Sequence, residues 1–167
     1  PIYPARPAAC ILEVEEGSPA DDAGFTPGCL ITEVNGHILR DVLDWQWYSA
    51  EDEVELSYVD TEGDSGTVVL EREEGESWGI TFDGAVFDGI RTCRNACVFC
   101  FMRQLPEDAR GSLVLRDDDW RLSFLQGNFV TLTNLSDEDA QTIIERNISP
   151  LRVSLHASDP DVRRKKI

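Results

Sequence analysis

Three cysteines lie within eight residues of one another, and their spacing has the most direct chemical meaning of any feature in the sequence. Cys93, Cys97 and Cys100 form a Cys-x3-Cys-x2-Cys pattern. Cysteine thiolates bind zinc and the irons of iron–sulfur clusters, and four of them close a structural zinc site or an electron-transfer cluster. A set of three leaves one coordination position open. The pattern therefore indicates a metal centre at which another molecule can bind.

Two other kinds of metal site are compatible with the same spacing. In the first, a distant imidazole or carboxylate completes a tetrahedral zinc site. The sequence has two histidines, and His156 is the suitable one because His37 belongs to the first half of the chain. In the second, the cysteines hold a redox cluster of the ferredoxin kind. The residues around the cysteines are therefore needed to distinguish these alternatives.

An acidic run follows the cysteines. Asp117, Asp118 and Asp119 are adjacent in sequence and could together bind a cation or accept hydrogen bonds from a substrate. Arg116 and Arg121 flank the run. Because opposite charges so close in sequence commonly pair at a surface, we favour a solvated or arginine-paired turn.

The elements that must position the cysteines alternate between strand and helix. Residues 86–90 are expected to form a strand that leads into the cysteine segment, and residues 128–133 form a strand rich in β-formers. Ser136 and Asp139 are spaced as in a capping box and begin a helix over residues 137–146, which has acids in its first turn, and residues 151–156 form the next strand. Such a unit predicts parallel pairing, which places His156 at the carboxyl end of its strand, where parallel barrels carry their chemistry.

A strand followed by Cys-x3-Cys-x2-Cys and further βα units resembles the start of a radical S-adenosylmethionine (SAM) enzyme. The resemblance implies that the three thiolates hold a [4Fe–4S] cluster and that SAM binds the remaining iron. An electron passed through the cluster would cleave SAM and yield a 5′-deoxyadenosyl radical. Phe99 matches the aromatic residue usually found before the last cysteine, which implies packing near the adenine. Asn134 stands roughly where related enzymes contact the methionine amino group, although the usual Gly-Gly-Glu is absent.

The first half of the chain has a different pattern. Residues 10–14 and 30–34 are expected strands, Ser18 is the expected N-cap of a short helix, and Asn35-Gly36 predicts a hairpin turn. Three more elements are expected, a helix and two strands, over residues 41–49, 53–59 and 67–72. The segment from Val14 to Gly36 resembles the signature of bacterial PDZ domains.

The resemblance to PDZ domains implies that a peptide could bind by adding a strand to the sheet. Such domains hold the peptide carboxylate in a glycine-containing loop, and no such loop precedes Cys10. The run from Trp78 to Phe82 looks similar, but it would require a permuted arrangement. We therefore favour a packing or docking module over a peptide-binding one.

Three long segments together resemble the DUF512 family, whose members are bacterial radical SAM or iron–sulfur oxidoreductases with a PDZ-like first domain. They cover residues 89–101, 116–135 and 150–160. The fold class that this resemblance implies is α/β plus β-rich. It consists of a PDZ-like module, residues 1–84, and the first βα units of a partial radical-SAM-type (β/α) barrel, residues 85–167. The family supplies no substrate. The alternative is a PDZ-like adaptor with a structural zinc or iron–sulfur site.

Composition limits the partners. The net charge is −17, and residues 1–90 alone carry 21 acidic against 3 basic side chains, so nucleic acid is not expected to bind there. No stretch approaches the roughly 18 to 20 apolar residues needed to cross a bilayer, so a cytoplasmic protein without membrane contact is expected. The chain begins without Met, and we expect it to be part of a longer polypeptide with too little barrel for turnover alone. Cys10 and Cys29 are expected to be buried small hydrophobes.

Overall fold

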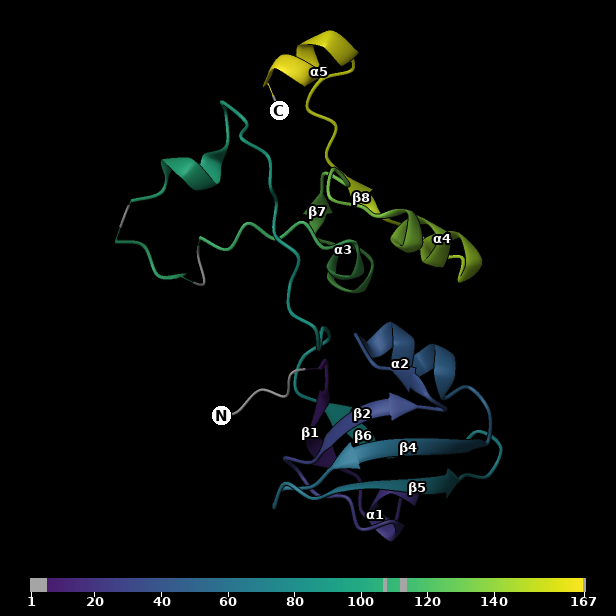
Figure 1. The fold of residues 1–167 in the computed structure, drawn as a ribbon. Coiled ribbons are helices and arrows are strands. Elements are labelled where there is room, and N and C mark those ends of the chain that lie inside the picture. Colours follow the sequence, from purple (N-terminus) through teal and green to yellow (C-terminus); the bar gives the residue numbers. More distant parts are fainter. Residues whose placement is uncertain (1–5, 107, 112–113, 167) are drawn as a thin grey trace. The chain divides into compact units, whose positions relative to one another are not determined.

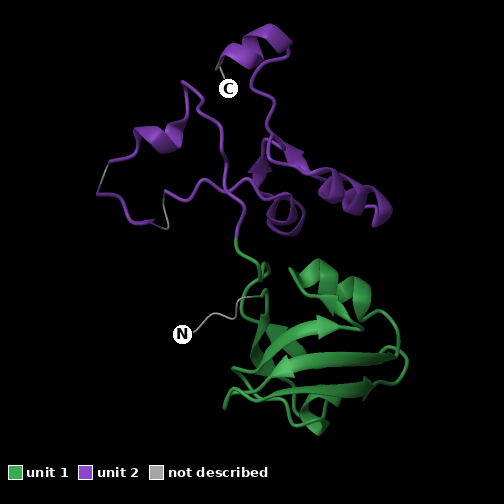
Figure 2. Ribbon diagram, viewed as in Figure 1, with its two compact units in different colours: residues 1–89 green, residues 90–167 purple. Residues whose placement is uncertain are grey.

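The computed structural model describes residues 6–106, 108–111 and 114–166. The chain divides into two compact units between Gly89 and Ile90 (Figure 2). Unit 1 runs up to Gly89, and unit 2 begins at Ile90. Residues 85–89 are thus grouped with the first half of the chain, and the domain limits 1–84 and 85–167 remain a prediction.

Unit 1 is built around an antiparallel sheet with two short helices (Figure 1). The strands follow the order β5-β4-β2-β1-β6, and β3 pairs with β2. The elements are β1 (Ala9–Val14), α1 (Pro19–Asp22), β2 (Leu30–Val34), β3 (His37–Ile38), α2 (Val42–Tyr48), β4 (Glu53–Val59), β5 (Ser65–Glu71) and β6 (Ile80–Phe82).

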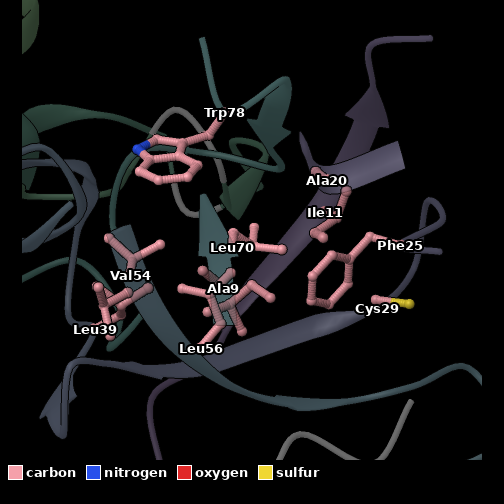
Figure 3. Close-up of a cluster of buried hydrophobic side chains, with 12 residues drawn as sticks. Ala9, Ile11, Ala20, Phe25, Cys29, Leu39, Val54, Leu56, Leu70 and Trp78 are labelled. Atoms are coloured by element: carbon pink, nitrogen blue, oxygen red, sulfur yellow. The ribbon is translucent and has the colours of Figure 1, made fainter. Parts of the chain in front are cut away.

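The core of unit 1 follows from alternation along the strands. In β4, Val54 and Leu56 are buried while the glutamates between and before them are exposed, the period-2 pattern of a strand with one covered face. Twelve buried side chains from the strands, from α1 and from the connecting loops meet in this core (Figure 3). The indole N–H of Trp78 donates to the Ser49 carbonyl at 3.0 Å, so the largest core side chain has its polar atom satisfied.

Local sequence signals explain how these elements begin and turn. The Ser18 hydroxyl accepts from the Asp21 N–H at 3.3 Å and caps α1, as predicted. Asn35 and Gly36 both have positive φ, 50° and 75°, which is the geometry of the tight hairpin turn between β2 and β3. Asp41 caps α2 by accepting from two backbone N–H groups at 2.9 Å. The strands and hairpin expected in the first half are therefore confirmed.

The two cysteines of unit 1 lie in the sheet region. Cys29 is buried, as expected, and Cys10 is half-buried. Burial, with the nearby Asp83 carboxylate and the Cys29 thiol, raises the pKa of the Cys10 thiol. Both are free thiols.

Unit 2 contains a short parallel strand pair with helices around it (Figure 1). Its elements are η1 (Phe101–Gln104), α3 (Trp120–Gln126), β7 (Phe129–Val130), α4 (Asp137–Glu145), β8 (Arg152–Val153) and α5 (Pro160–Lys166). Phe129 lies opposite Arg152 in the parallel ladder, so the expected strand–helix–strand unit and its parallel pairing are confirmed. Ser136 and Asp139 form a capping box at α4, which explains the start of that helix.

The expected strand over residues 86–90 is not formed. Val86 makes only an isolated bridge to Asp41, and the Phe87 N–H donates to the Arg40 carbonyl at 2.7 Å. The Phe87 ring also packs edge-on against Phe82 at 5.3 Å between centroids. These contacts bind the segment to unit 1, so it cannot lead as a strand into the cysteine segment.

Two other strands are shorter than the sequence indicated, and one helix was not predicted. The expected strand over 128–133 is reduced to β7, because Leu132 has a φ of 58°, which breaks an extended backbone. The strand over 151–156 is reduced to β8. Helix α3 was missed although the sequence carries local signals for it: Asp119 caps it, and Gly127, with a φ of 79°, ends it.

The part of unit 2 that the structure describes contains one parallel strand pair, β7 and β8. The predicted partial (β/α) barrel is not seen in these residues. The fold is mixed α/β with an antiparallel sheet in unit 1. Among the helices of the described residues, none has the length and apolar character to cross a membrane.

Candidate metal and cofactor site

Backbone pairing fixes the start of the cysteine segment. Thr92 forms an antiparallel bridge with Asp117. The Cys93 N–H donates to the Arg116 carbonyl at 2.7 Å, and the Asp118 N–H donates to the Arg91 carbonyl at 2.8 Å. The chain entering the cysteines is thus held against the acidic run that precedes α3.

A buried charge network lies beneath this pairing. Asp119 and Arg121 are almost fully buried, and the guanidinium donates to both carboxylate oxygens, at 2.8 and 2.6 Å. The Asp119 carboxylate also accepts from the Arg91 N–H at 3.1 Å. Burial opposes ionisation of Asp119. The hydrogen bonds from the Arg121 side chain and the Arg91 N–H, together with the positive charge of Arg121, outweigh burial and keep the pKa of Asp119 below its usual value. The interpretation of the acidic run as an arginine-paired turn is confirmed for Asp119.

The other two acids of the run are also occupied by protein donors. The buried Asp118 carboxylate accepts from the Thr131 N–H at 2.5 Å and from the Thr131 hydroxyl at 2.7 Å. Asp117 accepts from the Asn128 amide at 2.8 Å. Their role in this structure is to connect the segment before α3 to β7 and the turn preceding it.

Asn95 joins the cysteine segment to the carboxyl end of β7. Its amide N–H donates to the Thr131 hydroxyl at 3.3 Å, and its amide oxygen accepts from the Thr133 hydroxyl at 3.0 Å. Arg116 donates to the Asn95 carbonyl at 3.4 Å. The Asn134 amide donates to the Thr92 carbonyl at 3.4 Å. The residues just after β7 therefore contact the backbone and side chains around Cys93.

The three cysteines occupy different environments. Cys97 is buried, while Cys93 and Cys100 are half-buried. The described residues contain no group of three His, Cys, Asp or Glu side chains arranged to hold a metal, so the thiols are not gathered around a common centre here. In number and donor type they suit three irons of a [4Fe–4S] cluster, since thiolates are the ligands of such clusters.

Phe99 and His156 meet across unit 2. Their rings pack edge-on with centroids 5.1 Å apart, and Phe99 is 43% exposed. His156 follows β8, so the contact brings the last part of the cysteine segment to the carboxyl end of this strand. Sequence reasoning identified both residues but did not predict their contact.

A cavity of about 590 Å³ opens at the carboxyl ends of β7 and β8. Residues that follow the two strands line it, together with Asn95 and two arginines of α5: Thr131, Thr133, Ser154, His156, Arg163 and Arg164. Sequence reasoning missed Asn95, Thr131, Thr133, Ser154 and the two arginines. The available signal for the hydroxyls was their place directly after parallel strands, where α/β proteins bind ligands.

Comparison with known proteins identifies the class of the chain. Residues 72–167 match the family described as a radical SAM-like domain, more than half of the sequence. The chain belongs to this radical SAM-like domain family. No curated protein sequence matches the chain.

Similar solved structures include PDZ domains of SdrC-like proteins from two Listeria species. The Listeria monocytogenes domain is 20% identical with a TM-score of 0.40, and the match covers 47% of this chain and 90% of that one. The Listeria innocua domain is 21% identical with a TM-score of 0.39, and the match covers 48% of this chain and 98% of that one.

Proposed function

We propose that Cys93, Cys97 and Cys100 bind a [4Fe–4S] cluster and that SAM binds the iron that the cysteines leave open. Membership of the radical SAM-like family supports this proposal. The observation that carries it is the link from Asn95 to Thr131 and Thr133, because it ties the cysteine segment to the ligand-binding edge of parallel strands. The bound cluster and SAM would supply reductive cleavage to a 5′-deoxyadenosyl radical.

Two residues are proposed to contact SAM. Phe99 would pack near the adenine, since its ring is part-exposed beside His156. Asn134 would contact the methionine amino group, and its hydrogen bond to the Thr92 carbonyl keeps it next to the first cysteine. The same proposal includes membership of the DUF512 family, oxidoreductase chemistry and a radical-SAM-type (β/α) barrel.

Anaerobic reconstitution with iron and sulfide tests the cluster. We expect a brown protein with roughly four irons per chain, the content of a [4Fe–4S] centre. Replacing Cys93, Cys97 or Cys100 by Ala should each remove the colour, and Cys10→Ala is the matched control because that thiol lies in unit 1. One bound zinc per chain with no visible absorption would instead support the alternative of a structural zinc site.

A second candidate function is recognition of a peptide carboxylate by unit 1. A cavity of about 260 Å³ is lined by α2 and by the segment before β6, including Trp45, Arg72 and Trp78. The Arg72 guanidinium stacks over the Trp78 ring at 4.6 Å. Its two terminal nitrogens donate to the Glu76 carbonyl at 3.3 Å and to the Ala50 carbonyl at 2.8 Å, and its buried Nε has no hydrogen-bond partner among the described residues. The Asp52 carboxylate is 3.6 Å from this Nε, beyond hydrogen-bond length.

The peptide proposal is tested with a library of peptides that have free C-termini. Retention that is lost when the peptides are amidated, and lost in Arg72→Gln, supports carboxylate recognition. If nothing is retained, unit 1 acts as the packing or docking module that the sequence favoured.

A further inference from the structure

The charged side chains that line the cavity at the ends of β7 and β8 are basic. Arg163 and Arg164 both line it, and among the described residues no Asp or Glu does. Neither arginine side chain forms an ion pair with a residue that the structure describes. Residues 91–167 carry 11 acidic and 12 basic side chains, so unit 2 has almost no net charge of its own. Two guanidinium groups without an ion-pair partner among the described residues, at a concave surface that no carboxylate lines, mark a site for negative charge.

Several of the remaining polar groups that line the cavity already form hydrogen bonds within the protein. The Thr131 and Thr133 hydroxyls and the Asn95 amide bond one another and Asp118, so they form a fixed wall. The Ser154 N–H is also used, because it donates to the Val130 carbonyl at 2.8 Å. The guanidinium groups are therefore the principal donors left for a ligand, and guanidinium planes match the oxygens of carboxylates and phosphates.

The cavity is next to the proposed SAM contacts but separate from them. Neither Phe99 nor Asn134 is among its lining residues, whereas Asn95 and His156 line it. His156, which lines the cavity, packs against the Phe99 ring. A molecule in this space would therefore lie beside the cysteine segment without occupying the proposed SAM contacts.

We propose that this cavity binds an oxyanion group, carboxylate or phosphate, of the substrate on which the SAM-derived radical acts. The Arg163 and Arg164 guanidinium groups would donate hydrogen bonds to this oxyanion. The inference rests on the proposed function, because the cysteine segment defines where the chemistry takes place. Anion binding by the two arginines is itself measurable without turnover.

Calorimetric titration of the reconstituted protein with pyrophosphate, and separately with succinate, tests the inference. We expect saturable binding of at least one probe, which also identifies the preferred oxyanion. The Arg163→Gln/Arg164→Gln variant should bind at least tenfold more weakly. The Arg103→Gln/Arg110→Gln variant removes the same charge from unit 2 outside the cavity and should bind as the unmodified chain does.

Three results would overturn the inference: no binding of either probe, equal weakening in both double variants, or competition between the probe and SAM. Competition would assign the arginines to the carboxylate of SAM itself. Iron content is measured on every sample. Cavity variants that keep roughly four irons but no longer bind the anion would show that the arginines act in anion binding and not in cluster binding. A protein that holds no iron but still binds the anion would contradict the proposed cluster and leave the proposed anion site standing.

Discussion

The Arg91 guanidinium lies 2.5 Å from the Asp139 carboxylate and joins the chain just before the cysteines to the first turn of α4. The same carboxylate accepts from the Ser136 hydroxyl at 2.6 Å and from the Trp120 indole N–H at 3.1 Å. One carboxylate thus connects the cysteine segment, α3 and α4. Although burial opposes its ionisation, the hydrogen bonds from Arg91, Ser136 and Trp120 lower the pKa of Asp139 to about 2.

Asp139 should make the stability of unit 2 depend on pH. Its pKa is lower in the folded chain than in the unfolded chain, about 2 against about 3.9, so its contribution is complete above roughly pH 5 and is lost as pH falls towards 2. Because Arg91 is partly exposed, we expect about 1–2 kcal/mol. Urea unfolding at pH 7 and pH 3 measures it, and Asp139→Asn should reduce this difference. An unchanged pH dependence in that variant would contradict the assignment.

Asn95→Ala should weaken the cluster more than it weakens the fold. The substitution removes the bonds to Thr131 and Thr133 that hold the cysteine segment on β7, and groups that orient metal ligands affect metal affinity by about 10–100-fold. Iron loss to a chelator should therefore be about tenfold faster. Gln141→Ala removes another amide side chain, which donates to Glu145 within α4, and should leave the rate unchanged. Equal rates for Asn95→Ala and the original chain would count against the link.

Asp118→Ala should destabilise unit 2 strongly. Its buried carboxylate accepts from the Thr131 N–H and hydroxyl. The N–H would lose its partner, whereas the hydroxyl would keep its contact with the Thr133 hydroxyl. An unsatisfied buried polar group costs about 1–3 kcal/mol, so we expect a loss within that range. Chemical denaturation followed by circular dichroism measures it. Asp108→Ala, at an exposed carboxylate, is the control and should change little.

The sequence was most informative where one short segment contains the whole signal. The Asn35-Gly36 turn and the Ser136 capping box each depend on neighbouring residues, and both formed as expected. The strand over 86–90 failed because Phe87 packs against Phe82 and its N–H binds Arg40, contacts that no local pattern encodes.

Some residues of the candidate site were likewise predictable from local sequence, and others were not. Spacing alone singled out the cysteines, and position before the last cysteine singled out Phe99. The link from Asn95 to Thr131 spans 36 residues, and the arginines of α5 lie farther along the chain still. Such contacts depend on how the strands end and pair, so they became visible only in the folded chain.

Gly79→Ala should destabilise unit 1 through a close approach of two backbone segments. Gly79 has a φ of 75°, and a Cβ there would overlap the Ser18 side chain, which caps α1. Gly75 has a similar φ of 84° but open space around the same position. Both Ala variants therefore carry the cost of a left-handed backbone, about 1 kcal/mol, and only Gly79→Ala adds the overlap.

Thermal unfolding should show Gly79→Ala to be at least about 1 kcal/mol less stable than Gly75→Ala, because relieving the overlap displaces the cap hydroxyl. Equal losses in the two variants would mean that the Ser18 side chain moves aside without cost and that the close approach does not stabilise the start of α1.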